Sequence, residues 1–229
     1  MKPVFVALDT PELARARELT EAVREHAGGI KLGLEFFSAN GPAGIRQVAE
    51  LGLPLFLDLK LHDIPNTVAR AVEALAPLEP AVLSVHAAGG RAMLAAAKAA
   101  APERTKVVAV TVLTSLDAVD LAEAGVICSP REQVERFAEL ARDAGVDGIV
   151  CSGAELLAVR RLWPDAFLVV PGVRPHGSDA DDQKRTVTPR EALEDGASIL
   201  VIGRPITEAA DPAQAIKDIA ASLGSGQYA

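Results

Sequence analysis

The sequence is short of aromatic residues, of positive charge and of cysteine, and these shortages limit the composition of the core and the kinds of partner and site that we expect. Aromatic residues make up 3% of the 229 residues, so alanine, leucine and valine have to fill most of the hydrophobic core. Acidic residues outnumber basic ones by 31 to 23, which gives a formal net charge of -8. A nucleic-acid-binding protein needs a basic face that neutralises phosphates, so we expect no nucleic-acid partner. An anionic small molecule would have to meet individually placed positive side chains.

Disulfides, metal sites and membrane segments are not indicated either. The two cysteines, Cys128 and Cys151, lack metal-ligand spacing and are expected to be reduced, buried thiols, and the four histidines form no metal set. No apolar run reaches the roughly 18 residues that would span a bilayer. The first residues, MKPVFVALD, have neither the apolar length nor the cleavage site of a signal peptide. We therefore expect a cytoplasmic protein that binds neither a metal nor a membrane.

Eight short apolar runs recur along the chain, each followed by a longer amphipathic stretch. They are rich in Val, Ile and Leu and nearly continuous, which is typical of parallel strands buried on both faces. The runs are Val4–Asp9, Gly29–Gly33, Pro54–Lys60, Ala81–Ala87, Lys106–Leu113, Gly148–Gly153, Phe167–Val173 and Ser198–Arg204.

The stretches between the runs carry helix-start signals. Thr10, Ser129 and Asp211 each precede a proline, which pairs an N-cap residue with proline at the first helical position. Eight strands alternating with about eight helices predict an α/β fold, a (β/α)8 TIM barrel that forms a single domain over residues 1–229. An open doubly wound sheet is the alternative, but no GxGxxG motif follows the first strand. The polar segment Pro175–Thr188, between the seventh and eighth strands, is predicted to be a functional lid.

Ionisable residues gather where the predicted strands end, which is where barrels carry their active sites. The first run ends in Asp9, the second holds Lys31, and the third ends in Asp58 and Lys60, with Asp63 just beyond. Asp58 and Lys60 are two residues apart on a strand, so their side chains point to the same side. A salt bridge that merely closes the barrel end is one interpretation. Charges on the neighbouring strands favour a catalytic site.

The end of the last strand has the features of a phosphate site. Barrels commonly bind phosphate with the loops after strands 7 and 8, and Gly203-Arg204 lies there in the segment VIGRPI. A glycine lets the backbone approach the phosphate, and an arginine can bind it through two hydrogen bonds. A surface arginine at a turn is the alternative. The residues alone thus predict a phosphate-binding barrel with a lysine–carboxylate site.

One segment resembles a known family signature. Residues 58–67, DLKLHDIPNT, resemble the pattern Asp-x-Lys-x-x-Asp-Ile-Pro-Asn-Thr of the orotidine 5'-monophosphate decarboxylase family. Leu61 stands where phenylalanine is common in that family, and Leu116 where methionine is common. Other blocks resemble the family in the same order: ALD around Asp9, IKLG around Lys31, VLTSL around Ser115, VPGVRP around Arg174 and VIGRPI around Arg204.

The resemblance implies a cofactor-free enzyme that decarboxylates orotidine 5'-monophosphate to UMP in pyrimidine biosynthesis. It implies a homodimer with shared active sites, in which Lys60 protonates C6 and Asp58 lies beside the substrate carboxylate. Lys31 and the partner subunit's Asp63 would complete the catalytic charge network. The implied substrate contacts are Asp9, Lys31, Asp63 and Thr67 at the ribose, Thr114 and Ser115 near the pyrimidine, Arg174, Gln183, Gly203 and Arg204 at the phosphate, and Pro171.

Two other functions remain open at this point. Metal-dependent phosphosugar lyases of the same suprafamily resemble the chain at Asp-x-Lys-x-x-Asp and use a divalent metal to stabilise an enediolate. The longer block ending in DIPNT argues against them. A non-catalytic nucleotide-phosphate-binding barrel would keep Arg204 and its glycine, but it would have no need for the lysine–carboxylate array.

Overall fold

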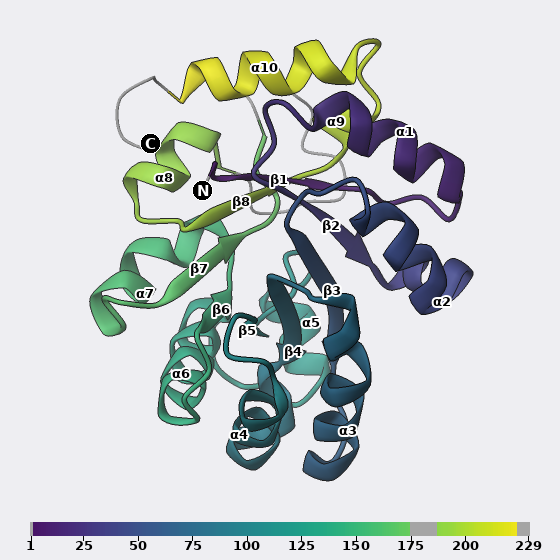
Figure 1. The fold of residues 1–229 in the computed structure, drawn as a ribbon. Coiled ribbons are helices and arrows are strands. Elements are labelled where there is room, and N and C mark those ends of the chain that lie inside the picture. Colours follow the sequence, from purple (N-terminus) through teal and green to yellow (C-terminus); the bar gives the residue numbers. More distant parts are fainter. Residues whose placement is uncertain (1, 175–186, 224–229) are drawn as a thin grey trace.

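Eight parallel strands close into a barrel in chain order, and β8 pairs with β1 (Figure 1). The computed structural model describes residues 2–174 and 187–223. The strands are β1 (Val4–Ala7), β2 (Gly29–Gly33), β3 (Leu55–Leu61), β4 (Val82–His86), β5 (Lys106–Val110), β6 (Gly148–Val150), β7 (Phe167–Val170) and β8 (Ile199–Ile202). All lie within the predicted runs except β3, which extends one residue further. The closed barrel predicted from the sequence is confirmed, and the doubly wound sheet is excluded.

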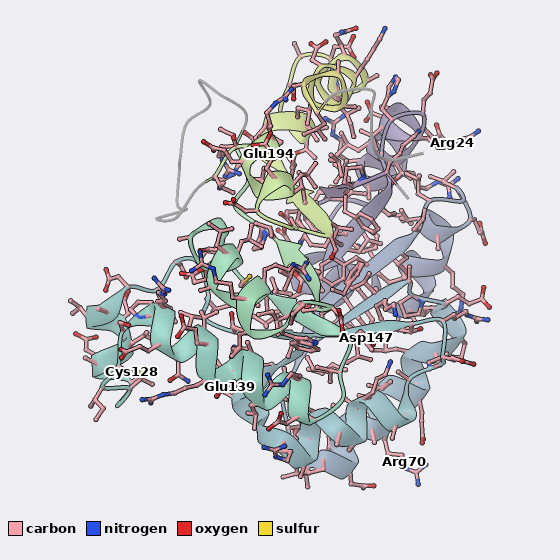
Figure 2. The ribbon with its side chains drawn as sticks, turned by 90° about the vertical axis from the view of Figure 1, so that its left-hand side faces the viewer. Arg24, Arg70, Cys128, Glu139, Asp147 and Glu194 are labelled. Carbon is pink, nitrogen blue, oxygen red and sulfur yellow. The ribbon has the colours of Figure 1, made fainter. Side chains whose placement is uncertain are left out.

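An outer layer of helices surrounds the barrel, and its exposed face carries charged side chains such as Arg24, Arg70, Glu139 and Glu194 (Figure 2). The α-helices are α1 (Leu13–Val23), α2 (Leu34–Ala49), α3 (Pro65–Leu75), α4 (Gly90–Ala100), α5 (Ala118–Glu123), α6 (Pro130–Asp143), α7 (Leu156–Leu162), α8 (Pro189–Glu194), α9 (Arg204–Thr207) and α10 (Pro212–Ser222). Short 3-10 helices cover Ala76–Leu78, Ala87–Gly89 and Gly153–Glu155.

Two of the three predicted helix caps are confirmed. The Ser129 hydroxyl accepts a hydrogen bond from the Glu132 N–H, and the Asp211 carboxylate accepts one from the Gln214 N–H. The predicted start of the first helix at Pro11 is wrong. The Thr10 hydroxyl accepts from the Glu12 N–H in a turn of its own, so α1 begins only at Leu13.

The cysteine prediction holds for one residue and fails in part for the other. Both thiols are free, and Cys151 is buried as expected. Cys128 is only half-buried, because it lies in the loop before α6, next to the almost fully exposed Ile127. Its Sγ donates a hydrogen bond to Gln133 Oε1 over 3.2 Å.

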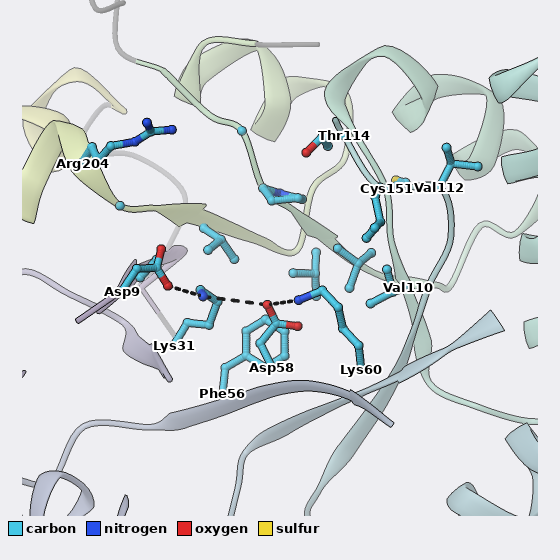
Figure 3. Close-up of a pocket in the computed structure, with 18 of the residues that line it drawn as sticks. Asp9, Lys31, Phe56, Asp58, Lys60, Val110, Val112, Thr114, Cys151 and Arg204 are labelled. Atoms are coloured by element: carbon cyan, nitrogen blue, oxygen red, sulfur yellow. Dashed lines mark hydrogen bonds and ion pairs between the residues drawn. The ribbon is translucent and has the colours of Figure 1, made fainter. Parts of the chain in front are cut away.

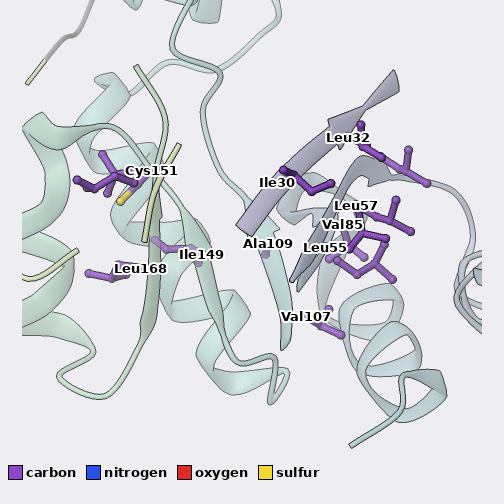
Figure 4. Close-up of a cluster of buried hydrophobic side chains, with 14 of the residues drawn as sticks. Ile30, Leu32, Leu55, Leu57, Val85, Val107, Ala109, Ile149, Cys151 and Leu168 are labelled. Atoms are coloured by element: carbon purple, nitrogen blue, oxygen red, sulfur yellow. The ribbon is translucent and has the colours of Figure 1, made fainter. Parts of the chain in front are cut away.

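Side chains alternate between two buried layers along each strand. Those that point outward pack under the helices, as Ile30, Leu32, Leu55 and Leu57 do in Figure 4. Each side chain of this size contributes about 1.5–3 kcal/mol when it is fully buried. The inward layer fills the barrel itself and consists of Phe5, Ala7, Phe56, Val82, Val108, Val169, Ile199 and Val201. Successive apolar side chains in each run therefore alternate between the outer layer and the barrel interior, although the run itself is continuously apolar.

The inward direction of Phe56 explains why Asp58, two residues further along β3, also points into the barrel. Two of the six phenylalanines, Phe5 and Phe56, fill the barrel, and a Cβ at Gly29 would lie 2.3 Å from the Phe5 ring. Phe56 points inward, and the strand period carries Asp58 to the inside one step nearer the carboxyl end. The aromatic floor thus ends where the ionisable residues begin.

Candidate active site

A pocket opens inside the mouth of the barrel, at the carboxyl ends of the strands (Figure 3). It encloses about 920 Å³ of space, a figure that includes its open mouth. Its apolar lining is Ala7, Phe56, Val110, Val112, Leu113, Val150, Val169 and Val201. Its other lining residues are Asp9, Lys31, Asp58, Lys60, Thr114, Cys151, Pro171, Gly172, Arg174, Gly203 and Arg204. A cleft that combines an apolar lining with polar and charged groups is typical of a small-molecule site.

Asp58 lies between two lysines on one wall of this pocket. Its Oδ2 is 2.7 Å from Lys60 Nζ and 3.8 Å from Lys31 Nζ. Lys31 Nζ also lies 2.9 Å from Asp9 Oδ1, so the charges alternate in sign along the wall (Figure 3). A Cβ at Gly33 would come within 3.2 Å of Lys31 Nζ, and glycine at this position leaves room for that ammonium.

The surroundings of Asp58 keep its carboxylate ionised. Burial alone would raise the pKa of Asp58, whose side chain is 14% exposed. The positive charges of Lys31 and Lys60, with hydrogen bonds from Lys60 and Ser84, outweigh burial and lower the pKa below 3.8. At neutral pH the pocket therefore presents a fixed negative charge held between two positive ones.

The backbone of β3 is irregular at this point. Lys60 has φ of +50°, a left-handed conformation that non-glycine residues rarely adopt, and the register of β3 against β4 shifts between Leu57 and Leu61. Backbone strain of this kind tends to occur at functional sites. Asp58 and Lys60 face the same pocket as predicted, although a regular strand is not what brings them together.

Ser84 on β4 is a buried site residue that the sequence analysis missed. Its hydroxyl bonds to the Asp58 carboxylate at 2.8 Å and to the Lys60 backbone nitrogen at 2.9 Å. The one feature of the sequence that could have indicated Ser84 is that it is the single hydroxyl residue within the run VLSVH.

Three of the predicted phosphate residues also line the pocket. Gly203 follows β8 and Arg204 begins α9, and both line the pocket. Arg174 and Pro171 line it from the segment after β7. The Arg174 N–H donates to the Val187 carbonyl at 3.0 Å. Two arginines from separate segments thus bring positive charge to the pocket.

Three of the predicted site residues that the structure describes do not line the pocket of their own chain. Asp63, Thr67 and Ser115 are exposed, because the chain turns outward after β3 and after β5. Asp63 accepts a hydrogen bond from the Ile64 N–H at 2.6 Å, and the Ile64 side chain is 66% exposed. Gln183 lies outside the described residues, as does the predicted lid apart from its last two residues.

Residues 2–174 and 187–223 contain no cluster of three or more His, Cys, Asp or Glu side chains arranged to hold a metal ion. None of their helices has the length and apolar character needed to cross a membrane.

Comparisons with known proteins agree over nearly the whole chain. The model of the orotidine 5'-phosphate decarboxylase / HUMPS family matches residues 2–219. The chain is 62% identical to the orotidine 5'-phosphate decarboxylase of Sphingopyxis alaskensis over 221 residues, covering 96% of this chain and 99% of the relative. It is 60% identical to that of Erythrobacter litoralis, with the same coverage. The crystal structure of the Lactobacillus acidophilus orotidine 5'-phosphate decarboxylase superposes with a TM-score of 0.86 at 36% identity, covering 98% of this chain and all of that one.

Proposed function

Because this chain belongs to the orotidine 5'-phosphate decarboxylase / HUMPS family, we propose that it decarboxylates orotidine 5'-monophosphate to UMP and carbon dioxide, a step of pyrimidine biosynthesis. The observation that carries the proposal is the carboxylate of Asp58 held between Lys31 and Lys60 in the pocket wall. The bond between C6 and the carboxyl group breaks, its electron pair stays on C6, and a proton from the enzyme forms the new C–H bond.

Lys60 is the proposed proton donor. No carbonyl next to C6 can take up the electron pair as an enolate, so the charge develops at an sp2 carbon. An ammonium fixed beside that carbon stabilises the charge as it forms and then delivers the proton. The Lys60 side chain is 31% exposed and lines the pocket, and its Nζ lies 2.7 Å from Asp58 Oδ2.

We propose that no metal or organic cofactor takes part. An electron-sink cofactor is one general solution to carbanion formation. Here two lysines supply positive charge beside an apolar floor that includes Val110, Val169 and Val201. Charge interactions are stronger in such a low-dielectric setting than in water.

The far side of the pocket is proposed to hold the rest of the nucleotide. Arg204, Gly203 and Arg174 are suited to the phosphate, with Gln183 as a further contact, and Asp9 with Lys31 to the ribose hydroxyls. Thr114 and Pro171 would border the pyrimidine, with Ser115 nearby. Since the phosphate takes no part in the chemistry, its binding energy can order the charged wall around the reacting carbon.

The first test is the loss of orotidine 5'-monophosphate absorbance with purified protein, before and after excess EDTA. Turnover that survives EDTA supports a metal-free decarboxylase. Activity that disappears with EDTA and returns with a divalent metal points to the metal-dependent chemistry of the HUMPS branch. Tight UMP binding without turnover in either condition indicates a nucleotide-binding barrel and contradicts the proposal.

We further propose a homodimer in which Asp63 and Thr67 complete the pocket of the partner subunit. Both residues are exposed near the mouth of a pocket that they do not line, beside the large exposed side chain of Ile64. An apolar side chain this exposed next to a site is suited to a subunit contact.

Complementation tests the shared site. Inactive Asp63→Ala and Lys60→Ala chains are mixed and allowed to exchange subunits. Each mixed dimer then has one intact site, and about a quarter of all sites should recover. Asp58→Ala mixed with Lys60→Ala is the control and should stay inactive, because both residues act in their own chain. No recovery after proven exchange would contradict the assignment of Asp63.

A further inference from the structure

We propose that Ser84 is a positioning residue of the active site, whose hydroxyl sets the orientation of both Asp58 and Lys60. This inference rests on the proposed function. Ser84 lies on β4, directly beside the irregular part of β3, and its side chain is fully buried. It does not line the pocket, so it would act through its two neighbours and not on the substrate.

The direction of both hydrogen bonds follows from their chemistry. A backbone nitrogen can only donate, so the Lys60 N–H donates to Ser84 Oγ over 2.9 Å. The hydroxyl has one proton, and it is free to be donated to the ionised Asp58 Oδ1, 2.8 Å away. One hydroxyl group thus connects the main chain of the proposed proton donor to the side chain of its carboxylate neighbour.

This link decides which oxygen of Asp58 faces the lysines. With Oδ1 held by Ser84, Oδ2 is turned to Lys60 Nζ at 2.7 Å and to Lys31 Nζ at 3.8 Å. The same hydroxyl provides an acceptor for the Lys60 N–H where the strand register shifts and φ is +50°. Without it, the carboxylate could rotate and the left-handed turn would lose the partner of its N–H.

The position of Ser84 in its strand argues against a packing role. Its neighbours Val82, Leu83 and Val85 are buried and apolar. A hydroxyl in such a run is unfavourable unless its hydrogen bonds are made, and an alanine or valine would suit the strand at least as well. The hydroxyl is therefore better explained by what it binds than by the space it fills.

The main test is the kinetics of Ser84→Ala. We expect kcat to fall about 10- to 100-fold while KM stays within about threefold, because the phosphate and ribose contacts are untouched. Ser84→Thr, which restores a hydroxyl, should recover much of the loss. If Ser84→Ala does not fold, Ser84→Cys has nearly the same volume and a weaker donor, and it should show the same loss in kcat.

A matched control lies at the other end of the barrel. The Ser198 hydroxyl accepts from the Leu168 N–H at 3.0 Å, which is the same type of bond, before β8. Ser198→Ala should lower the melting temperature but leave kcat unchanged. A Ser84→Ala kcat within twofold of the wild type would overturn the proposal, as would a Ser84→Thr no better than Ser84→Ala.

A second readout does not need turnover. The charged groups around Asp58 are Lys31 on β2 and Lys60 on β3, with Asp9 beyond Lys31. Since the Ser84 bond helps to lower the pKa of Asp58, Ser84→Ala should raise that pKa in a carboxyl NMR titration and move the acid limb of the kcat profile to higher pH. An unchanged Asp58 pKa would contradict the role of Ser84. An inactive wild-type chain would contradict the proposed function instead.

Discussion

Each end of the barrel holds a largely buried aspartate side chain between two lysines. At the carboxyl end Asp58 lies 2.7 Å from Lys60 and 3.8 Å from Lys31. At the amino end Asp147, just before β6, lies 2.6 Å from Lys98 and 3.3 Å from Lys106 (Figure 2). Both aspartate side chains are 14% exposed, and both have a lowered pKa. Residue types and distances alone do not distinguish the two clusters.

The difference lies in what surrounds each carboxylate. Asp147 Oδ2 also accepts a hydrogen bond from the Val107 N–H at 2.8 Å, so it secures the start of β5. Asp147 does not line the pocket at the barrel mouth. Asp58 and its lysines line that pocket, as does Arg204. Strand direction therefore gives one cluster access to a ligand and leaves the other to stabilise the fold.

The largest expected effect is on turnover, which should depend on the lysine of the carboxyl-end cluster and not on that of the amino-end cluster. Lys60→Ala is expected to lower kcat by more than about 10³-fold, because it removes the proposed proton donor and the charge stabilisation proposed for it. The substitution should leave substantial affinity for UMP, since the phosphate contacts remain. The assay is turnover of orotidine 5'-monophosphate together with UMP binding by calorimetry.

Lys98→Ala is the matched control, because its side chain is 31% exposed, as is that of Lys60, and it also pairs with a buried aspartate. Its kcat should stay within about threefold of the wild type. Similar losses in both variants would end the distinction between the two ends. Near-normal turnover in Lys60→Ala would remove Lys60 from the mechanism.

A smaller effect should come from the arginine that faces the pocket. Arg204→Ala is expected to weaken UMP binding by about 10- to 100-fold, the range for a hydrogen-bonded charge pair, and to change uridine binding little. Arg104, which pairs with Glu79 on the outside, offers the control, and Arg104→Ala should change neither affinity. Equal losses for UMP and uridine in Arg204→Ala would contradict a phosphate role.

The smallest effect should be one of stability at the amino end. Lys98→Ala is expected to lower the free energy of unfolding by about 1–3 kcal/mol near pH 7. Burial raises the pKa of Asp147, but the bonds to Lys98, Val107 and Lys106 outweigh it, so its folded pKa lies below 3.8. A lowered folded pKa stabilises the protein above pH 3.8, and this contribution disappears as the pH falls through the folded pKa.

Denaturant unfolding of the wild type and of Lys98→Ala across this pH range is the check. The difference between the two proteins should be largest near neutrality and should shrink at acid pH. A difference that does not depend on pH would show that Lys98 acts through packing and not through its charge.

The sequence was sufficient to predict the fold, because the residues of each strand by themselves indicate whether that strand is buried. Continuous apolar runs such as Gly29–Gly33 are needed where a strand is buried on both faces, and their ends fix which residues lie at the barrel mouth. Cap chemistry at Ser129 and Asp211 is also local and was predicted correctly. Thr10 was not, because the same residue types favour both turns and helix starts.

Part of the site could also be predicted from local sequence. Because the carboxyl ends of parallel strands meet at one rim of the barrel, the sequence predicted that one pocket is lined by Asp9, Lys31, Asp58, Lys60 and Arg204. Sequence determined that these charges share a rim, and the family signature named the chemistry. Only the tertiary structure decided that β3 shifts register near Lys60 and that Ser84 from the next strand holds both charged residues. It also decided that Asp63 and Thr67 do not line the pocket of their own chain. These features depend on contacts between residues distant along the chain, and local periodicity carries no information about such contacts.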